Sequence, residues 1–222
     1  MKKITTILII LALVCGAALA ETINVTVTNN QGKICLAWAP VEVTDIDGDG
    51  ALTLYDALYC AHETYYDGGA EAGFAAEDQG YGPSLTKLWG EDNGGSFGYC
   101  FNNAPAMSLA DPISSDGHVH AYAYQDLETW SDQFSYFQFT DRTALRLTLS
   151  VLGFDAEWNT VSSPLAGAAI TLDGEDTGLV TDEEGVVDIS ELNLSEPGDH
   201  IISAVYGDVV LVPPVFKITV TE

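Results

Sequence analysis

Residues 45–56 read DIDGDGALTLYD, and no other stretch of the chain carries chemistry this specific. Gly50, at the sixth position, permits a sharp turn, and an apolar residue and a hydroxyl follow at the eighth and ninth positions. Because alternate residues of a tight loop can direct their oxygens toward one point, the spacing predicts a site for a hard cation. Carboxylates occupy the first, third, fifth and twelfth positions, namely Asp45, Asp47, Asp49 and Asp56.

The spacing is that of an EF-hand-type calcium loop, since Ca²⁺ takes about six to eight oxygen ligands. Ala51 would offer its backbone carbonyl, and Thr53 would act directly or through a water molecule. The alternative is an acidic turn, rich in Asp and Gly, that only caps the helix that follows. The expected calcium ligands are Asp45, Asp47, Asp49, Ala51, Thr53 and Asp56.

The first 20 residues have the features of a secretory signal peptide. Two lysines precede an apolar run at residues 4–14, and Ala18-Leu19-Ala20 fits a small-x-small cleavage site. The apolar run is too short for a stable membrane span. We therefore expect cleavage before Glu21 and a secreted, extracellular protein, either released or held at the cell surface.

The chain is strongly acidic, with 33 Asp and Glu residues against seven Lys and Arg and a formal net charge of −26. Nucleic acid and anionic membranes are poor partners for such a surface. No second apolar stretch is long enough to span a bilayer. We expect an extracellular protein or glycan as the partner.

Three cysteines follow the expected signal peptide, Cys35, Cys60 and Cys100. They allow one disulfide with one thiol left over, either Cys60 with Cys100 or Cys35 with Cys100. The alternative is three buried free thiols, because a small secreted fold that depended on disulfides would carry more cysteines. None of the three has the spacing of a zinc or redox site.

The hydrophobic pattern predicts a mostly β chain with two domains. In residues 21–141, two alternating strands form a hairpin, a helix over residues 53–66 follows the acidic loop, and further strands come later. We expect an α+β domain there, a β-sheet with one covering helix and a calcium loop. In residues 142–222, short strands recur at intervals of about 8–12 residues, which predicts an antiparallel Ig-like β-sandwich.

The order of elements in residues 23–139 resembles the transcobalamin-like C-terminal domain, a β-grasp-like module of secreted bacterial proteins. The likeness rests on Asp56-Ala57-Leu58 in the helix, on the aromatic strand Tyr99-Cys100-Phe101-Asn102, and on Asp116-Gly117 before a strand. In cobalamin carriers such a module caps the corrin from one side, which implies an extracellular small-ligand carrier. The partner α-barrel of those carriers is absent from this sequence.

Two further resemblances concern the loop and the C-terminal half. Residues 45–56 are similar to one half of a dockerin repeat, which implies an accessory component of a polysaccharide-degrading system. A dockerin needs two such segments in tandem, and only one is present. The motifs PLAGAAITLDG at residues 164–174 and TDEEG at residues 181–185 are similar to transthyretin-like and Cna-B-like Ig modules of bacterial surface proteins.

Other candidate sites are weaker. His118 and His120 place two imidazoles on one face of a strand, but a transition-metal site needs further ligands, so we expect a polar face with two solvated histidines. No Gly-x-Ser-x-Gly motif or catalytic triad can be placed, and we expect no enzymatic activity. The candidates for contact with a ligand or partner are Trp89, Tyr99 and Trp130, of which Trp130 lies in a polar run.

Taken together, these patterns favour a secreted calcium-binding protein that acts by extracellular binding or adhesion, with the calcium in a structural role. The accessory component of a polysaccharide-degrading system and the small-ligand carrier are the alternatives.

Overall fold

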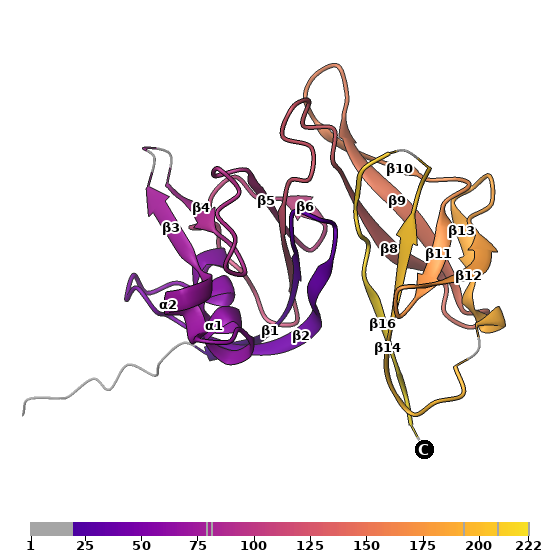
Figure 1. Ribbon diagram of the computed structural model, residues 1–222, viewed down its shortest axis with the longest axis horizontal. Coiled ribbons are helices and arrows are strands. Elements are labelled where there is room, and N and C mark those ends of the chain that lie inside the picture. The colour runs from indigo at the N-terminus through magenta and orange to yellow at the C-terminus, as the bar shows by residue number, and fades with distance from the viewer. Residues whose placement is uncertain (1–19, 79, 81, 193, 208, 222) are drawn as a thin grey trace, which may run out of the picture.

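The structure is a computed structural model that describes residues 20–221 except residues 79, 81, 193 and 208. The expected signal peptide lies outside the described residues apart from Ala20. Strands dominate, and the described residues hold two α-helices, which confirms the expected mostly β fold. Figure 1 shows two lobes, one drawn in indigo to magenta and one in orange to yellow. No helix in the described part of the chain is long and apolar enough to cross a membrane.

The first lobe is built on one sheet in the order β2-β1-β7-β5-β6. Strands β1 and β2 form the expected antiparallel hairpin, while β7 lies parallel to β1 and antiparallel to β5. A separate antiparallel pair, β3 and β4, follows the two helices. The bounds are β1 Ala20–Thr28, β2 Ile34–Thr44, α1 Leu54–Tyr65, α2 Gly69–Gly73, β3 Ala75–Asp78, β4 Pro83–Lys87, β5 Phe97–Phe101, β6 Ala104–Pro105 and β7 His118–Ala123.

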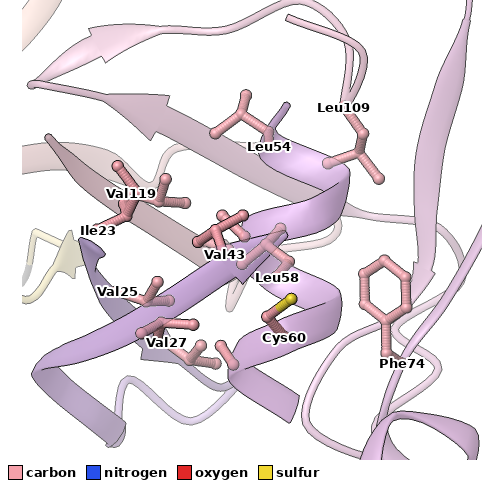
Figure 2. Packing of buried hydrophobic residues seen from close by; sticks show 14 of the residues in the cluster. Ile23, Val25, Val27, Val43, Leu54, Leu58, Cys60, Phe74, Leu109 and Val119 are labelled. Carbon is pink, nitrogen blue, oxygen red and sulfur yellow. The ribbon is translucent and has the colours of Figure 1, made fainter. Parts of the chain in front are cut away.

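Helix α1 covers one face of this sheet. The alternating residues of β1 that face it are fully buried, as is an apolar stripe of the helix at residues 54, 57, 58 and 61, whereas Tyr65, one turn further on, is exposed. Figure 2 shows Ile23, Val25 and Val27 of the strand and Leu54 and Leu58 of the helix in this shared core. The helix begins with a capping box, in which Thr53 and Asp56 each accept a hydrogen bond from the backbone of the other. The buried set includes Ile23, Val25, Val27, Leu54, Ala57, Leu58 and Ala61.

The second lobe is a sandwich of two sheets around its own core, in which Leu147, Leu149, Ile170 and Ile202 are fully buried. One sheet has the order β10-β9-β8-β15, with β13 also on β9, and the other has the order β12-β11-β14-β16. The pairs are antiparallel except for β15 with β8. The bounds are β8 Gln133–Asp141, β9 Arg146–Phe154, β10 Thr160–Pro164, β11 Ala169–Leu172, β12 Glu175–Val180, β13 Val186–Asp188, the 3₁₀ helix Ile189–Glu191, β14 Gly198–Val205, β15 Leu211–Val212 and β16 Phe216–Val220.

The expected boundary at residues 141 and 142 falls between β8 and β9, which pair with each other. The chain therefore passes from one lobe to the other before β8. A third buried cluster joins the lobes, because Tyr122 of β7 packs with Phe134 and Tyr136 of β8 and with Val212 of β15. Cys35, Cys60 and Cys100 are all free thiols, and the latter two are buried.

Candidate functional site

The acidic loop lies between β2 and the N-terminus of α1. Asp45, Asp47 and Asp49 each place a carboxylate oxygen within 4.8 Å of the others. Asp45 is half-buried, whereas Asp47 and Asp49 are exposed to solvent. Three carboxylates at this separation, open on one side, can bind a divalent cation and leave room for water ligands.

Backbone hydrogen bonds hold these carboxylates in place. The N–H groups of Gly48 and Gly50 donate to the two carboxylate oxygens of Asp45 at 2.7 and 3.0 Å. The N–H of Ala51 donates to Asp49 at 2.8 Å. Gly48 and Gly50 have φ values of 78° and 90°, a left-handed conformation that residues with a Cβ adopt at a cost. The glycines of the sequence thus bend the backbone so that its amides face the carboxylates.

The carboxylates of the loop also repel one another. The backbone N–H of Asp49 lowers the pKa of Asp47, but burial and the charges of Asp49, Asp56 and Asp45 outweigh this effect. The net result is a pKa of Asp47 above its ordinary value. A bound cation would relieve this repulsion and favour the ionised form.

Asp56, the expected ligand at position twelve, is fully buried and does not belong to the group of three. One of its oxygens accepts hydrogen bonds from the N–H of Thr53 at 2.9 Å and from the Thr53 hydroxyl at 2.7 Å. The other accepts the N–H of Ile46 at 2.8 Å. Asp56 therefore ties the start of the loop to the first turn of α1, and the hydroxyl of Thr53 is directed to Asp56.

The three expected contact aromatics differ in exposure. Trp89 is half-buried and packs edge-on against Tyr66, with ring centroids 5.2 Å apart. Tyr99 is half-buried against the core of the first lobe, and desolvation raises its pKa. Trp130 is 55% exposed and tilted against Tyr124 at 5.2 Å. Of the three, Trp130 is the one presented to solvent.

Two exposed aromatics were not anticipated from the sequence. Phe154 and Trp158, at the turn between β9 and β10, are 60% and 81% exposed, with ring centroids 6.1 Å apart. Asp155 organises the turn by accepting hydrogen bonds from the N–H groups of Glu157 and Asn159 at 2.9 and 2.8 Å. The available signal was the polar setting of Trp158, which resembles that of Trp130.

The expectation that His118 and His120 are solvated is wrong. Both are buried, and their Nε2 atoms form hydrogen bonds with the hydroxyls of Thr26 at 2.8 Å and Thr28 at 3.0 Å. The reason is that β7 lies inside the sheet, where Trp38 of β2 stacks on His118 with ring centroids 3.8 Å apart and Phe134 of the second lobe lies 5.3 Å from the ring of His120. Desolvation lowers the pKa of His118 to about 3 and that of His120 well below its ordinary value.

His62, on α1, is buried and joins the helix to the segment after β4. The backbone N–H of Trp89 donates to Nε2 of His62 at 3.0 Å, so the proton of the neutral ring lies on Nδ1. The Nδ1–H group donates a hydrogen bond to the carbonyl oxygen of Leu58, with Nδ1 and the oxygen 2.6 Å apart. Desolvation lowers the pKa of His62 to about 4, against the opposing effect of the Leu58 carbonyl.

In comparisons with known proteins, no family model, no curated protein and no solved structure matches this chain.

Proposed function

We propose that this protein is a secreted, non-enzymatic binding or adhesion protein of the extracellular space, in which calcium bound by the acidic loop acts as a structural clamp. The observation that carries the proposal is the convergence of the carboxylates of Asp45, Asp47 and Asp49 to within 4.8 Å. The spacing of the loop supports calcium as the cation, because hard oxygen ligands alternate through a turn at Gly50.

The clamp role follows from where the loop is attached. Asp56 links Ile46 to Thr53 and so fixes the loop to α1, the helix that covers the sheet. Calcium bound by the loop would hold the end of β2 and the start of α1 together. A single loop in this position supports a structural ion better than a docking device, for which dockerins need two loops.

The binding role is supported by the exposed aromatic side chains. Trp130, Phe154 and Trp158 stand on turns that internal hydrogen bonds hold in place. Large aromatic side chains on ordered turns give a wide contact area at low cost in conformational entropy. An extracellular protein or a glycan is the partner that suits such a surface, and the likeness to Ig modules of bacterial surface proteins supports the same location.

The proposal is tested by titrating the calcium-free protein with Ca²⁺ in a calorimeter, beside the variants Asp49→Asn and Asp176→Asn. Asp176 is the matched control, because it too accepts a hydrogen bond from the N–H two residues later, at 2.9 Å. We expect one site in the wild type and in Asp176→Asn, and weaker binding in Asp49→Asn. Equal binding in the two variants would contradict the assignment.

The carrier function remains the second candidate because a cavity of about 550 Å³ lies between the lobes. The β1–β2 turn lines one side and the outer face of β11 and β14 lines the other, with Ile34, Ile201 and Val205 among its residues. Its size is within the range of small-molecule sites, about 300–1,000 Å³. Calorimetry with a small apolar ligand tests this candidate, and the absence of saturable binding would contradict it.

A further inference from the structure

A second cleft between the lobes, of about 520 Å³, lies between β2 on one side and β8 and β16 on the other. Four aromatic residues and two cationic residues line it, together with one aliphatic and one amide residue. Among the lining residues are Trp38, Phe139, Phe216, Arg142 and Lys217.

The charge of this cleft is opposite to that of the whole chain. The sequence has seven basic residues against 33 acidic ones, and two of the seven meet here. Among the described residues that line the cleft, none is acidic. In so acidic a chain, a cleft lined by two cationic and no acidic residues has a charge opposite to that of most of the surface. Such a charge favours the binding of an anion.

Arg142 and Lys217 differ in how free their charged groups are to bind an anion. Arg142 is exposed, lies 4.5 Å over the ring of Phe139, and takes part in no ion pair within the described residues. Lys217 is partly buried and its Nζ lies 3.2 Å from Asp199, which stands outside the lining. The free guanidinium is the better partner for a carboxylate, since its planar fork can donate two parallel hydrogen bonds.

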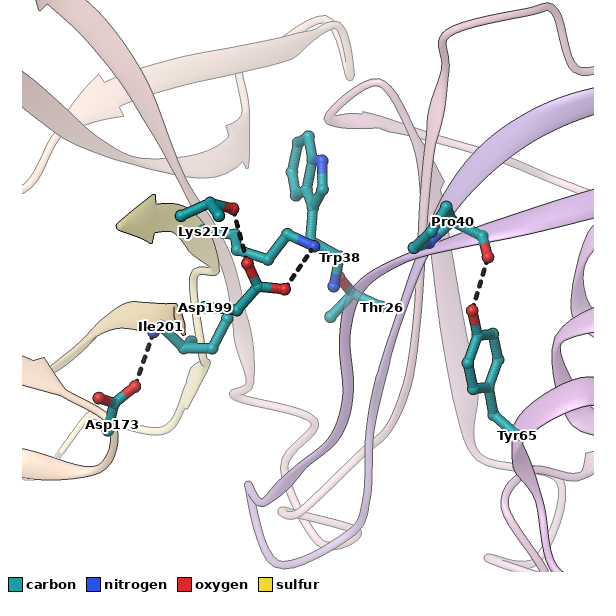
Figure 3. Close-up of polar contacts among 9 residues, drawn as sticks. Thr26, Trp38, Pro40, Tyr65, Asp173, Asp199, Ile201 and Lys217 are labelled. Carbon is teal, nitrogen blue, oxygen red and sulfur yellow. Dashed lines mark hydrogen bonds and ion pairs between the residues drawn. The ribbon is translucent and has the colours of Figure 1, made fainter. Parts of the chain in front are cut away.

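The aromatic walls are fixed by their own contacts. Phe139 and Phe216 pack edge-on with centroids 5.0 Å apart. On the facing side, Trp38 stacks on His118 at 3.8 Å, and its backbone N–H donates to Thr26 at 3.1 Å. Figure 3 shows the indole of Trp38 standing between the lobes near Lys217. Walls held in this way can bind a flat ring without first becoming ordered.

We propose that this cleft binds a small organic anion that carries a carboxylate on a flat ring. The ring lies between Trp38 and the Phe139–Phe216 pair, and the carboxylate accepts hydrogen bonds from the guanidinium of Arg142. The volume suits a molecule of one or two rings. The site is separate from the acidic loop and does not need calcium.

The experiment is calorimetric titration with 2-naphthoate and with its uncharged amide, on the wild type, Arg142→Gln and Arg146→Gln. Arg146 is the matched control, an exposed arginine outside the cleft that pairs with Asp188 at 3.7 Å. We expect saturable binding of one naphthoate per chain and at least about tenfold weaker binding of the amide. Arg142→Gln should lose about tenfold in affinity, and Arg146→Gln should match the wild type.

Three results would each overturn the proposal: no saturable binding of naphthoate at millimolar concentration, equal affinity for the amide, or equal loss in the two arginine variants. Arg142 is exposed, so its variant should fold, and the thermal unfolding curves of both variants check this. Naphthoate affinity should be the same in calcium and in EGTA. A failure here therefore leaves the calcium proposal standing, and a failure of calcium binding leaves this one standing.

Discussion

The carboxylate of Asp56 accepts a hydrogen bond at 2.8 Å from the backbone N–H of Ile46, ten residues earlier in the chain. Its second oxygen accepts the N–H and the hydroxyl of Thr53, and the side chain is fully buried. The side chain of Asp56 therefore both closes the loop and caps the helix. Because Asp56 is not one of the three converging carboxylates, a substitution of Asp56 tests these two roles separately from cation binding.

Asp56→Ala should lower the free energy of unfolding by about 2–4 kcal/mol, because it leaves buried backbone donors without partners and removes a helix cap. Urea unfolding in EGTA measures the loss without any contribution from calcium. Asp176→Ala is the control and should cost less than about 0.5 kcal/mol, since Asp176 is exposed. A loss of similar size in both variants would refute the role assigned to Asp56.

Stability should fall as the pH drops below about 6.5, the ordinary pKa of histidine. Burial lowers the folded-state pKa of His62 to about 4 and that of His118 to about 3, so the unfolded chain binds more protons in this range. Each histidine should contribute a slope of about 1.4 kcal/mol per pH unit between pH 6.5 and its folded pKa.

Variants of two histidines separate this effect from the titration of the carboxylates. Removing His118, as in His118→Asn, should make the stability less dependent on pH between pH 6.5 and 5. His200→Asn should act in the opposite sense and above pH 6.5, because hydrogen bonding to Asp173 raises the pKa of His200, so the stability that this residue adds is lost as the pH rises through that pKa. Parallel stability curves for the wild type and His118→Asn across this range would refute the prediction.

Trp158→Ala should leave the melting temperature almost unchanged, since the side chain is 81% exposed, and Trp158→Gly should be at least as stable as Trp158→Ala. The reason is the φ of 64° at this residue, which glycine adopts without strain. Trp89→Ala is the contrasting variant, and it should cost about 2 kcal/mol because Trp89 packs on His62 and Tyr66. If Trp158→Ala is as destabilising as Trp89→Ala, Trp158 is part of the packing and not a contact surface.

Gly185→Ala should be more destabilising than Gly178→Ala, although both glycines have nearly the same φ, 74° and 75°. A Cβ at Gly185 would lie 2.9 Å from the backbone of Leu149 and Leu165, whereas at Gly178 it would meet nothing within 4 Å. We expect a loss of about 1 kcal/mol at Gly178 and about 3 kcal/mol or more at Gly185. Chemical unfolding of the two variants measures the difference, and equal losses would contradict the packing of the second lobe.

The spacing of apolar residues correctly predicted those strands and helices of the first lobe that bury one face against an element close to them in the sequence. The alternation at Ile23, Val25 and Val27 and the stripe at Leu54 and Leu58 both point into the core. The spacing of Asp45, Asp47 and Asp49 led us to expect their carboxylates to lie close together, and they do, because the geometry of the loop is set within a dozen residues; the calcium itself stays a prediction.

The contacts that the sequence did not reveal are those made at long range. His118 and His120 looked exposed because polar residues on one strand face usually are, yet Trp38 of β2 stacks on His118 and Phe134 of the other lobe packs against His120. The sequence also placed β8 in the first domain, whereas β8 pairs with β9 in the second lobe. The alternation of apolar and polar residues within Gln133–Asp141 shows that the segment is a strand, but it does not show which sheet the strand joins. The cleft of Arg142 and Lys217 forms only when the lobes meet.

Thermal unfolding of the wild type and of Asp45→Ala, each in calcium and in EGTA, tests the calcium clamp most directly. With free calcium at about ten times the dissociation constant, binding should stabilise the wild type by about 1.4 kcal/mol, and Asp45→Ala should lose most of this gain. In EGTA the two proteins should differ by less than they do in calcium, since only the loop hydrogen bonds of Asp45 are then lost. Identical melting temperatures of the wild type in calcium and in EGTA would contradict the proposal.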